Sequence, residues 1–267
     1  MAHLAIIGTG YVGLTTGACL AHLGHDVVCA DIDEEKVAGL SRGEVSIVEE
    51  GLGDLVLEGL TNGRLQFVVG ALEAVSDCEA AFLCVPTPQG GDGSVDLSFV
   101  EAAAAEMAEA MPPAALIVNK STVPVGSTQV VERVMQRTDV KVVSNPEFLR
   151  EGSAVRDFLF PDRIVIGSDD QEAAEKVASF YDDIDAPILI TDPASAETIK
   201  YASNAFLATK LSFVNALAAV CEGVGADVND VVKGLGYDRR IGHQYLQPGP
   251  GWGGSCFPKD TRAFLSL

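Results

Sequence analysis

The sequence predicts an α/β fold in which a doubly wound parallel sheet precedes a long central helix and a small helical domain. Three features of the 267-residue chain favour this class. Short apolar segments alternate with helix-like segments over residues 3–190, which is typical of a parallel sheet covered on both faces. A glycine-rich turn follows the first apolar segment. A helical pattern without proline runs from residue 194 to about residue 223.

The glycine-rich turn has the pattern of a dinucleotide-binding loop. It joins the apolar segment 3–7 to a helix-like stretch, and its sequence is GTGYVG over residues 8–13. A second apolar segment, 26–30, ends at Asp31, 18 residues after the last glycine. In Rossmann folds the ribose-binding acid follows this glycine by roughly 20 residues. The pattern therefore predicts a Rossmann-type sheet with a nucleotide at the helix N-terminus.

Each residue of this nucleotide motif has an expected task. Gly8 permits the tight turn, Gly10 lets a pyrophosphate approach the backbone, and Gly13 lets the helix pack closely on the strand. Asp31 is expected to accept hydrogen bonds from the adenosine ribose hydroxyls, which favours NAD over NADP. Lys36 is either a solvated helix residue or a second contact to the ribose or phosphate.

Further apolar segments predict strands, and three of them lead into loops suited to ligand binding. The expected strands are 65–69, 80–85, 115–119, 140–144, 163–167 and 187–190. The loops are PTP at 86–88, KSTVPVGST at 120–128 and NPEFLREG at 145–152. Ligands bind beyond the carboxyl ends of strands in open α/β sheets, so these loops are expected to line a site.

The long helix over residues 194–223 is expected to leave the first domain and to pack against something large, such as another subunit. Lys200 and Asn204 are four residues apart and therefore lie on one helix face. Their neighbours Ala202, Ala205 and Phe206 indicate that the helix is mostly buried. A shorter helix is expected over residues 227–235.

The segment GWGGSCFPKD, residues 251–260, contains the strongest candidate nucleophile, Cys256. The glycines permit unusual backbone conformations and a close approach of a ligand. Lys259 and free backbone N–H groups would raise the fraction of thiolate, which is the nucleophilic form. The alternative is a buried cysteine beside a turn, since free cysteines usually serve as small hydrophobes. The glycine loop and the Lys259–Asp260 pair favour the nucleophile.

The composition limits the class of partner and the compartment. With 38 acidic and 18 basic residues the net charge is −20, which argues against nucleic acid as a partner. Acids spread along the whole chain indicate adaptation to high salt, a hypothesis that folding in low salt would test. We expect a cytoplasmic protein without a membrane span, signal peptide or disulfides. The six cysteines and four histidines show no metal-binding spacing.

Taken in order, these motifs resemble the UDP-glucose/GDP-mannose dehydrogenase family. The resemblance covers essentially the whole chain, through GTGYVG, VPTP, KSTVPVGST, NPEFLREG, Lys200 with Asn204, RIG at 240–242 and GWGGSCFPKD. It implies oxidation of the C6 alcohol of a nucleotide sugar to the carboxylate with two NAD. It also implies an NAD-binding domain over residues 1–192 and a central helical domain over 193–267. The second Rossmann-like domain that normally follows, and binds the nucleotide, is absent from this sequence.

The resemblance further implies a covalent mechanism. Cys256 attacks the aldehyde left by the first hydride transfer, and the thiohemiacetal becomes a thioester that water hydrolyses. Lys200 and Asn204 stabilise negative charge on the C6 oxygen. The other implied assignments are a base and water-positioning pair (Glu147, Thr122), an acid that holds Lys200 or a water (Asp260), and a loop over the sugar (247–253).

The implied contacts to cofactor and substrate are broader sets, and Arg240 is expected to reach a neighbouring subunit's site. The cofactor set is Gly8, Gly10, Tyr11, Val12, Gly13, Asp31, Lys36, Thr87, Thr122, Glu151 and Lys259. The substrate set is Glu147, Phe148, Leu149, Glu151, Lys200, Asn204, Arg240, Tyr245, Gly251 and Gly253. We therefore expect a homodimer or a larger homo-oligomer.

Three alternatives stay open at this point. A two-electron β-hydroxyacid dehydrogenase also combines a Rossmann domain with a long helix that carries Lys and Asn four apart, but it needs no cysteine. A nucleotide-binding remnant without turnover is the second alternative. Within the family, NPEFLREG and GWGGSCFPKD favour UDP-glucose as the substrate, and GDP-mannose stays possible.

Overall fold

A computed structural model describes residues 1–90, 95–254 and 257–265 of the chain. The chain divides into two compact units. The first unit comprises Met1–Pro88 and Val95–Lys200, and the second comprises Gln89–Ser94 and Tyr201–Leu267. The domain boundary expected between residues 192 and 193 stays a prediction.

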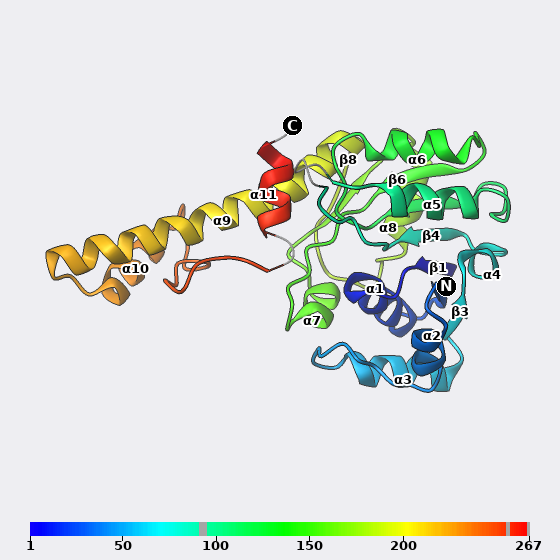
Figure 1. The fold of residues 1–267 in the computed structure, drawn as a ribbon, viewed down its shortest axis with the longest axis horizontal. Helices are drawn as coiled ribbons and strands as arrows, with labels where there is room; N and C mark the ends of the chain where they lie inside the picture. The colour runs from blue at the N-terminus through cyan, green and yellow to red at the C-terminus, as the bar shows by residue number, and fades with distance from the viewer. Residues whose placement is uncertain (91–94, 255–256, 266–267) are drawn as a thin grey trace. The chain divides into compact units, whose positions relative to one another are not determined.

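The first unit is built on an eight-stranded sheet with the order β3-β2-β1-β4-β5-β6-β7-β8 (Figure 1). Neighbouring strands pair in parallel except β6 and β7, which are antiparallel. The predicted sheet is thus mostly parallel, with β7 and β8 reversed. The strands are β1 (His3–Ile7), β2 (Asp26–Asp31), β3 (Leu65–Val69), β4 (Ala80–Leu83), β5 (Leu116–Asn119), β6 (Lys141–Ser144), β7 (Ile164–Gly167) and β8 (Ile188–Thr191).

Helices cover both faces of this sheet, as the alternating pattern predicts. One face packs against α1 (Tyr11–His22), α2 (Glu34–Ser41), α3 (Leu52–Asn62), α7 (Ala154–Leu159) and α8 (Gln171–Ser179). The other packs against α4 (Ala71–Val75), α5 (Ser98–Met107) and α6 (Ser127–Met135).

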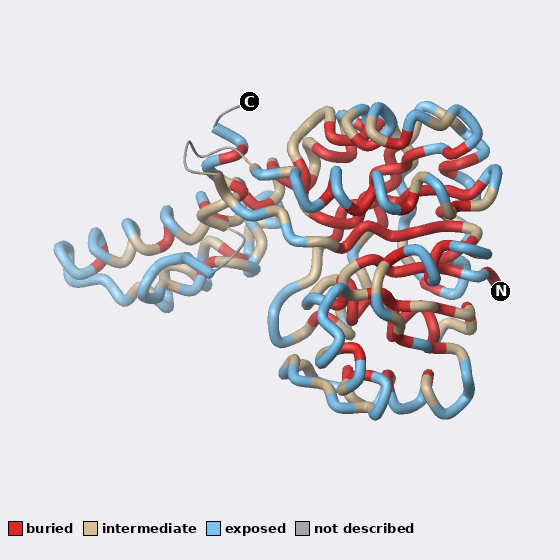
Figure 2. The backbone as a smooth tube through the Cα atoms, turned by 45° about the vertical axis from the view of Figure 1, so that its right-hand side comes forward, coloured by how far each residue is buried: buried red, intermediate tan, exposed pale blue. Residues whose placement is uncertain are grey.

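Strand β1 shows how the two faces form two cores. Leu4 and Ile6 enter the first core, whereas Ala5 and Ile7 enter the second. Successive side chains of a strand point to opposite faces, so an unbroken apolar strand supplies both cores. The buried strands between the helical layers are visible in Figure 2.

Aspartate side chains fix the starts of several helices. Asp33 accepts a hydrogen bond from the backbone N–H of Lys36 at the start of α2. Asp170 caps α8 in the same way, and Asp227 caps α10 (Val228–Gly236) in the second unit. Each such cap satisfies a backbone donor that the helix itself leaves unpaired. Part of the acidic composition is therefore used to define helix boundaries.

The long helix α9 (Pro193–Val224) begins in the first unit and continues through the second, with Pro193 at its first position, where a missing N–H is harmless. Its length agrees with the prediction. The expectation that it is mostly buried is wrong, because Phe206 is 65% exposed and Phe213 is 54% exposed. An apolar sequence indicates that a helix face is buried, but it does not show whether the same chain or a second molecule buries it.

Helix α9 is also the one helix among the described residues that is long and apolar enough to cross a membrane by length and composition alone. Such a single helix is weak evidence for a span, because core helices pass the same test. The helix also contains the charged residues Glu197, Lys200 and Lys210.

Candidate functional site

The glycine loop lies where the strand order reverses, between β1 and β4. Gly8 has φ +96°, and a Cβ there would lie 2.7 Å from the carbonyl oxygen of Cys84. A Cβ at Gly13 would lie 1.8 Å from the carbonyl oxygen of Gly8, whereas a Cβ at Gly10 would meet nothing within 4 Å. Gly8 and Gly13 are thus required by packing, and the backbone at Gly10 faces open space.

The first turn of α1 is suited to an anion. No side chain caps this end of the helix, and the first turn contains no acid. Its residues Tyr11 and Val12 are half-buried, directly after the open backbone of Gly10. Unpaired N–H groups and the helix dipole both favour a negative group here. The cradle at Gly10 therefore fits the pyrophosphate of a dinucleotide.

Asp31 lies at the end of β2 and accepts hydrogen bonds from Thr9, Lys36 and the backbone N–H of Asp33, the last at 3.2 Å. The Thr9 backbone N–H is 2.9 Å from Oδ2, the Thr9 hydroxyl is 2.5 Å away, and Lys36 Nζ is 2.8 Å away. Burial opposes ionisation of the carboxyl, but the bonds from Lys36 and Thr9 outweigh it and lower the Asp31 pKa to about 2. Asp31 is therefore a firmly ionised acceptor, and Lys36 is part of its network.

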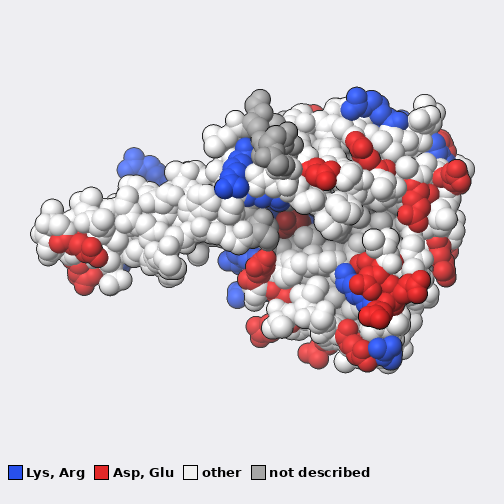
Figure 3. Space-filling model, viewed as in Figure 1, with Lys and Arg blue, Asp and Glu red and all other residues white. Residues whose placement is uncertain are grey.

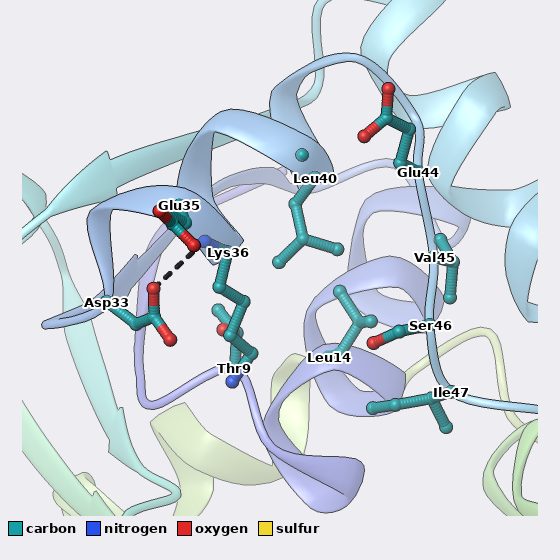
Figure 4. A pocket seen from close by; sticks show the side chains of 11 residues that line it. Thr9, Leu14, Asp33, Glu35, Lys36, Leu40, Glu44, Val45, Ser46 and Ile47 are labelled. Carbon is teal, nitrogen blue, oxygen red and sulfur yellow. Dashed lines mark hydrogen bonds between the residues drawn. The ribbon is translucent and has the colours of Figure 1, made fainter.

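A pocket of about 530 Å³ opens beside this network (Figure 4). Leu14 and Leu40 form an apolar side together with Val45 and Ile47, and Lys36 lies at the polar side. A pocket with one apolar and one polar side is suited to a flat base attached to a ribose. The polar lining comprises Thr9, Asp33, Glu35, Lys36, Glu44 and Ser46.

Lys200 and Glu147 form a buried ion pair in the first unit. Lys200 Nζ is 2.9 Å from Glu147 Oε1, and the two side chains are 5% and 6% exposed. Glu147 Oε2 also accepts a hydrogen bond from the backbone N–H of Leu149 at 2.6 Å. The ring of Phe148 lies 5.4 Å from Lys200 Nζ and 3.6 Å from the Arg163 guanidinium. The structure thus brings four of the predicted substrate residues together, and this pair can exchange a proton or stabilise charge.

The loop at the end of β5 is tied to its neighbours through its backbone. The Thr87 hydroxyl donates to the carbonyl of Thr122 at 2.9 Å, which joins two predicted cofactor residues. Farther along the loop, the N–H groups of Gly126 and Thr128 donate to Glu197 at 2.6 and 3.1 Å. Glu197, one turn before Lys200 on α9, was not predicted. Burial raises its pKa, although these hydrogen bonds oppose the shift.

A second group that was not predicted comprises Lys120, Asn145 and Tyr181, which contact one another in the first unit. Lys120 is 5% exposed, and its Nζ lies 3.1 Å from Asn145 Oδ1, which also accepts from the Tyr181 hydroxyl at 2.6 Å. Burial lowers the pKa of Lys120 to about 8. Lys120 and Asn145 open the motifs KSTVPVGST and NPEFLREG, so their positions could have indicated a role, but Tyr181 carries no local signal.

In the second unit Asp260 joins two other predicted residues. Asn204 Nδ2 donates to Asp260 Oδ2 at 2.7 Å, and Lys259 Nζ lies 2.9 Å from Oδ1. Asp260 was expected to hold Lys200 or a water, whereas Lys200 is paired with Glu147 as described above. Cys256 lies outside the described residues. In the segment 251–260, the structure thus describes the contacts of Asp260 with Lys259 and with Asn204.

The remaining predicted substrate residues of the second unit are less enclosed. Gly251, with φ +120°, and Gly253 are exposed, and a Cβ at either position would meet nothing within 4 Å. Tyr245 is half-buried with φ 59°. The Arg240 side chain is 88% exposed and pairs with Asp238. Such exposure is compatible with the expected reach of Arg240 to another subunit, which stays a prediction.

No metal centre appears in the part of the chain that the structure describes, because no group of three or more His, Cys, Asp or Glu side chains there could hold an ion. The described cysteines at 19, 29, 78, 84 and 221 are free and buried. Burial raises the pKa of the Cys19 thiol to about 12, which keeps it protonated and unreactive. Cys19 is therefore a poor nucleophile.

Sequence profiles of two consecutive domains match nearly the whole chain. The NAD-binding domain of the UDP-glucose/GDP-mannose dehydrogenase family matches residues 2–185. The central domain of the same family matches residues 194–267.

Individual relatives agree with these profiles. UDP-glucose 6-dehydrogenase of Rhizobium meliloti is 49% identical over 272 residues, which cover 98% of this chain and 62% of that enzyme. The solved UDP-glucose dehydrogenase of Pyrobaculum islandicum is 45% identical with a TM-score of 0.96, covering 100% of this chain and 63% of that one. The solved GDP-mannose dehydrogenase of Pseudomonas aeruginosa is 34% identical with a TM-score of 0.85, covering 99% and 64%. The chain thus spans less than two thirds of the length of these relatives.

Proposed function

Because the chain belongs to the UDP-glucose/GDP-mannose dehydrogenase family, we propose that it forms the NAD-binding and catalytic part of an enzyme that oxidises a nucleotide sugar at C6. The proposed overall reaction converts UDP-glucose to UDP-glucuronate. The observation that carries the proposal is the presence, in one unit, of a dinucleotide cradle and a buried Lys200–Glu147 pair. Hydride transfer requires both an acceptor and groups that manage the alcohol proton.

NAD would be held by residues that the structure already arranges around the glycine loop. The open backbone at Gly10 would receive the pyrophosphate, and the pocket bounded by Leu14 and Leu40 would receive the adenine. Asp31 would accept from the ribose hydroxyls and repel a 2′-phosphate, so NAD is preferred over NADP. The bound cofactor supplies a hydride acceptor. Thr87, Thr122, Glu151 and Lys259 complete the proposed contacts.

The first oxidation would use Lys200, Asn204 and Glu147. Lys200 and Asn204 would donate to the C6 oxygen as negative charge develops there, and one such donor contributes roughly 3–4 kcal/mol in other enzymes. Glu147, already hydrogen-bonded to Lys200, would accept the alcohol proton directly or through Lys200. In the described structure Lys200 contacts Glu147 and Asn204 contacts Asp260, so the sugar oxygen would join existing networks.

The second oxidation would require Cys256. Its thiolate adds to the aldehyde carbon, the thiohemiacetal loses a hydride to become a thioester, and water releases the carboxylate and the free thiol. Thr122 and Glu147 would position this water. The sequence of the cysteine loop and the family membership support this role, while the described residues contribute the adjoining Asn204–Asp260–Lys259 group.

UDP-glucose is the preferred substrate over GDP-mannose, because the UDP-glucose enzymes cited above are 45% and 49% identical to the chain and the GDP-mannose enzyme is 34% identical. The test is NADH release with UDP-glucose, GDP-mannose and N-acetylated nucleotide sugars. Release with UDP-glucose alone supports the proposal. One NADH per sugar would favour the two-electron alternative, and NAD binding without turnover would favour a nucleotide-binding remnant.

The exposed side of α9 is the proposed interface with a second copy of the chain. Phe206, Phe213, Val220 and Val224 are 65%, 54%, 59% and 74% exposed. Their spacing of seven, seven and four residues places them on one face of the helix. A self-complementary apolar stripe suits a two-fold dimer, in which each copy covers the other. The cytoplasm and a high-salt environment are the proposed setting, from the composition alone.

A further inference from the structure

Glu49 connects two segments of the first unit that are far apart in the sequence. It lies in the connection between α2 and α3, and three donors converge on its carboxylate. Glu49 Oε1 accepts short hydrogen bonds from the Tyr11 hydroxyl and the Gly152 N–H, and Oε2 accepts from the Ala154 N–H at 2.9 Å. Gly152 and Ala154 are 103 and 105 residues away. No other part of the proposed mechanism uses this carboxylate.

The two connected segments are both parts of the proposed NAD site. Tyr11 is the first residue of α1, directly after the open backbone of Gly10. Gly152 ends the motif NPEFLREG, which contains Glu147 and the proposed cofactor contact Glu151. The Tyr11 hydroxyl also lies 2.9 Å from the carbonyl oxygen of Arg150. Tyr11 therefore contacts this segment directly and through Glu49.

The turn around Gly152 is fixed from its other side as well. The Arg150 side chain pairs with Asp157 of α7 at 2.5 Å, and the Arg150 N–H donates to the same carboxylate at 3.0 Å. Gly152 adopts φ +90°, a conformation that favours glycine. Asp157 thus holds the turn onto α7, and Glu49 holds it toward the glycine loop.

The protonation states agree with this arrangement. Burial raises the pKa of the Tyr11 hydroxyl, and the hydrogen bond and charge of Glu49 raise it further. Tyr11 is therefore a permanent donor at neutral pH. A carboxylate that accepts from a hydroxyl and two backbone N–H groups uses ionic hydrogen bonds, which are the stronger class. Glutamine in its place would offer one oxygen and would turn an N–H donor toward another donor.

We propose that Glu49 is a positioning residue that locks the glycine loop to the turn at 150–154, so that both segments meet NAD in one fixed arrangement. The inference rests on the proposed function, since it concerns the same NAD site. A role confined to capping α7 would involve only Gly152 and Ala154. A cap of α7 does not require the hydrogen bond from Tyr11 to Glu49. Removing that bond alone therefore distinguishes the proposed lock from a simple helix cap.

The test compares binding of NAD and of AMP to the full chain by calorimetry. AMP would occupy the adenosine pocket and place its single phosphate at the glycine loop, but it lacks the nicotinamide half that the turn at 150–154 is proposed to contact. The variants are Tyr11→Phe, Glu49→Gln and the double substitution, with Glu50→Gln, an exposed neighbour, as the matched control. Thermal unfolding of each variant verifies that it is folded. If Glu49→Gln does not fold, Tyr11→Phe alone carries the test, because it leaves both backbone N–H contacts in place.

We expect each single variant to bind NAD about tenfold more weakly, the loss of one hydrogen bond to a charged group, with AMP binding unchanged. The double variant should lose less affinity than the sum of the two single losses, because both substitutions break the Tyr11–Glu49 hydrogen bond. Wild-type affinity for NAD in folded Tyr11→Phe, or equal losses for AMP and NAD, would overturn the role of Glu49 while the proposed function stands. A wild-type chain that binds neither ligand would overturn both proposals.

Discussion

Asp31 and the Lys200–Glu147 pair show two different uses of charge in one unit. Asp31 remains partly accessible, and its donors Thr9 and Lys36, which also line the neighbouring pocket, hold it ionised. Lys200 and Glu147 are enclosed and form an ion pair at 2.9 Å. In the proposed mechanism the first arrangement offers an acceptor to the cofactor, and the second offers a donor and an acceptor to the substrate.

The Asp31 network predicts a specific response of stability to acid. The folded pKa of about 2 lies below the ordinary value of 3.8, so the stabilisation is complete above that value and is lost as pH falls from about 4 to about 2. In urea unfolding, the difference in unfolding free energy between wild type and Asp31→Asn should therefore shrink over this window. Asp54→Asn, an exposed acid on α3, provides the control. A difference that stays constant with pH would contradict the network.

Breaking the Lys200–Glu147 pair should be strongly destabilising. Lys200→Met leaves the Glu147 carboxylate buried without its cation, and removal of one partner of such a pair typically costs about 3–5 kcal/mol. Adding Glu147→Gln to this variant should restore much of the loss, because no buried charge then remains. Urea unfolding of the single and double variants measures both values. A single variant within about 1 kcal/mol of wild type would show that the pair is not enclosed.

At the scale of elements, the order of strands and loops positions the proposed site. Strands β1, β4, β5 and β6 run in parallel, so the loops that follow them gather at one edge of the sheet. These strands, the glycine loop and the long helix could all be predicted, because each depends on a local pattern of apolar residues, glycine or proline.

Other features could not be predicted because they depend on contacts between distant segments. The reversal of β7 is one example, since its residues RIVIG are equally suited to either direction. The converging contacts on Glu49 are another, because no local pattern relates Glu49 to Gly152. The exposure of Phe206 is a third, since burial of an apolar helix face can come from a second molecule.

The exposed apolar stripe of helix α9 leads to a prediction about the assembly of the chain into a dimer. Substitution Phe213→Lys places a charge in the centre of the exposed stripe and should shift a dimer toward monomer in analytical ultracentrifugation. Glu222→Gln, on the opposite face of the same helix, should leave the assembly unchanged. A wild-type chain that sediments as a monomer at micromolar concentration in high salt would contradict the proposed interface.

At the scale of the whole molecule, the net charge of −20 dominates the surface. Figure 3 shows Asp and Glu side chains over several parts of the first unit. Some acidic residues of the chain have local structural roles, since Asp33 and Asp170 cap helices α2 and α8. The excess of acid over base nevertheless produces self-repulsion that opposes the compact state.

Salt should therefore stabilise the protein. At about 1 M salt the screening length falls to about 3 Å, which removes most of the repulsion between exposed acids. We expect the thermal midpoint to rise steadily from low salt to this concentration. A neutral osmolyte is the control, because it stabilises proteins by its exclusion from their surface and does not screen charges. Full stability at low salt with no further rise would refute the proposed adaptation to high salt.

A four-electron oxidation through Cys256 releases two NADH for each UDP-glucose, so the number of NADH released is the decisive measurement. The wild type should release two NADH and form UDP-glucuronate. Cys256→Ser, a far weaker nucleophile at neutral pH, should retain part of the first oxidation and yield aldehyde or a trapped adduct instead of acid. Production of the acid by Cys256→Ser at near wild-type rate, with two NADH per sugar, would contradict the covalent mechanism.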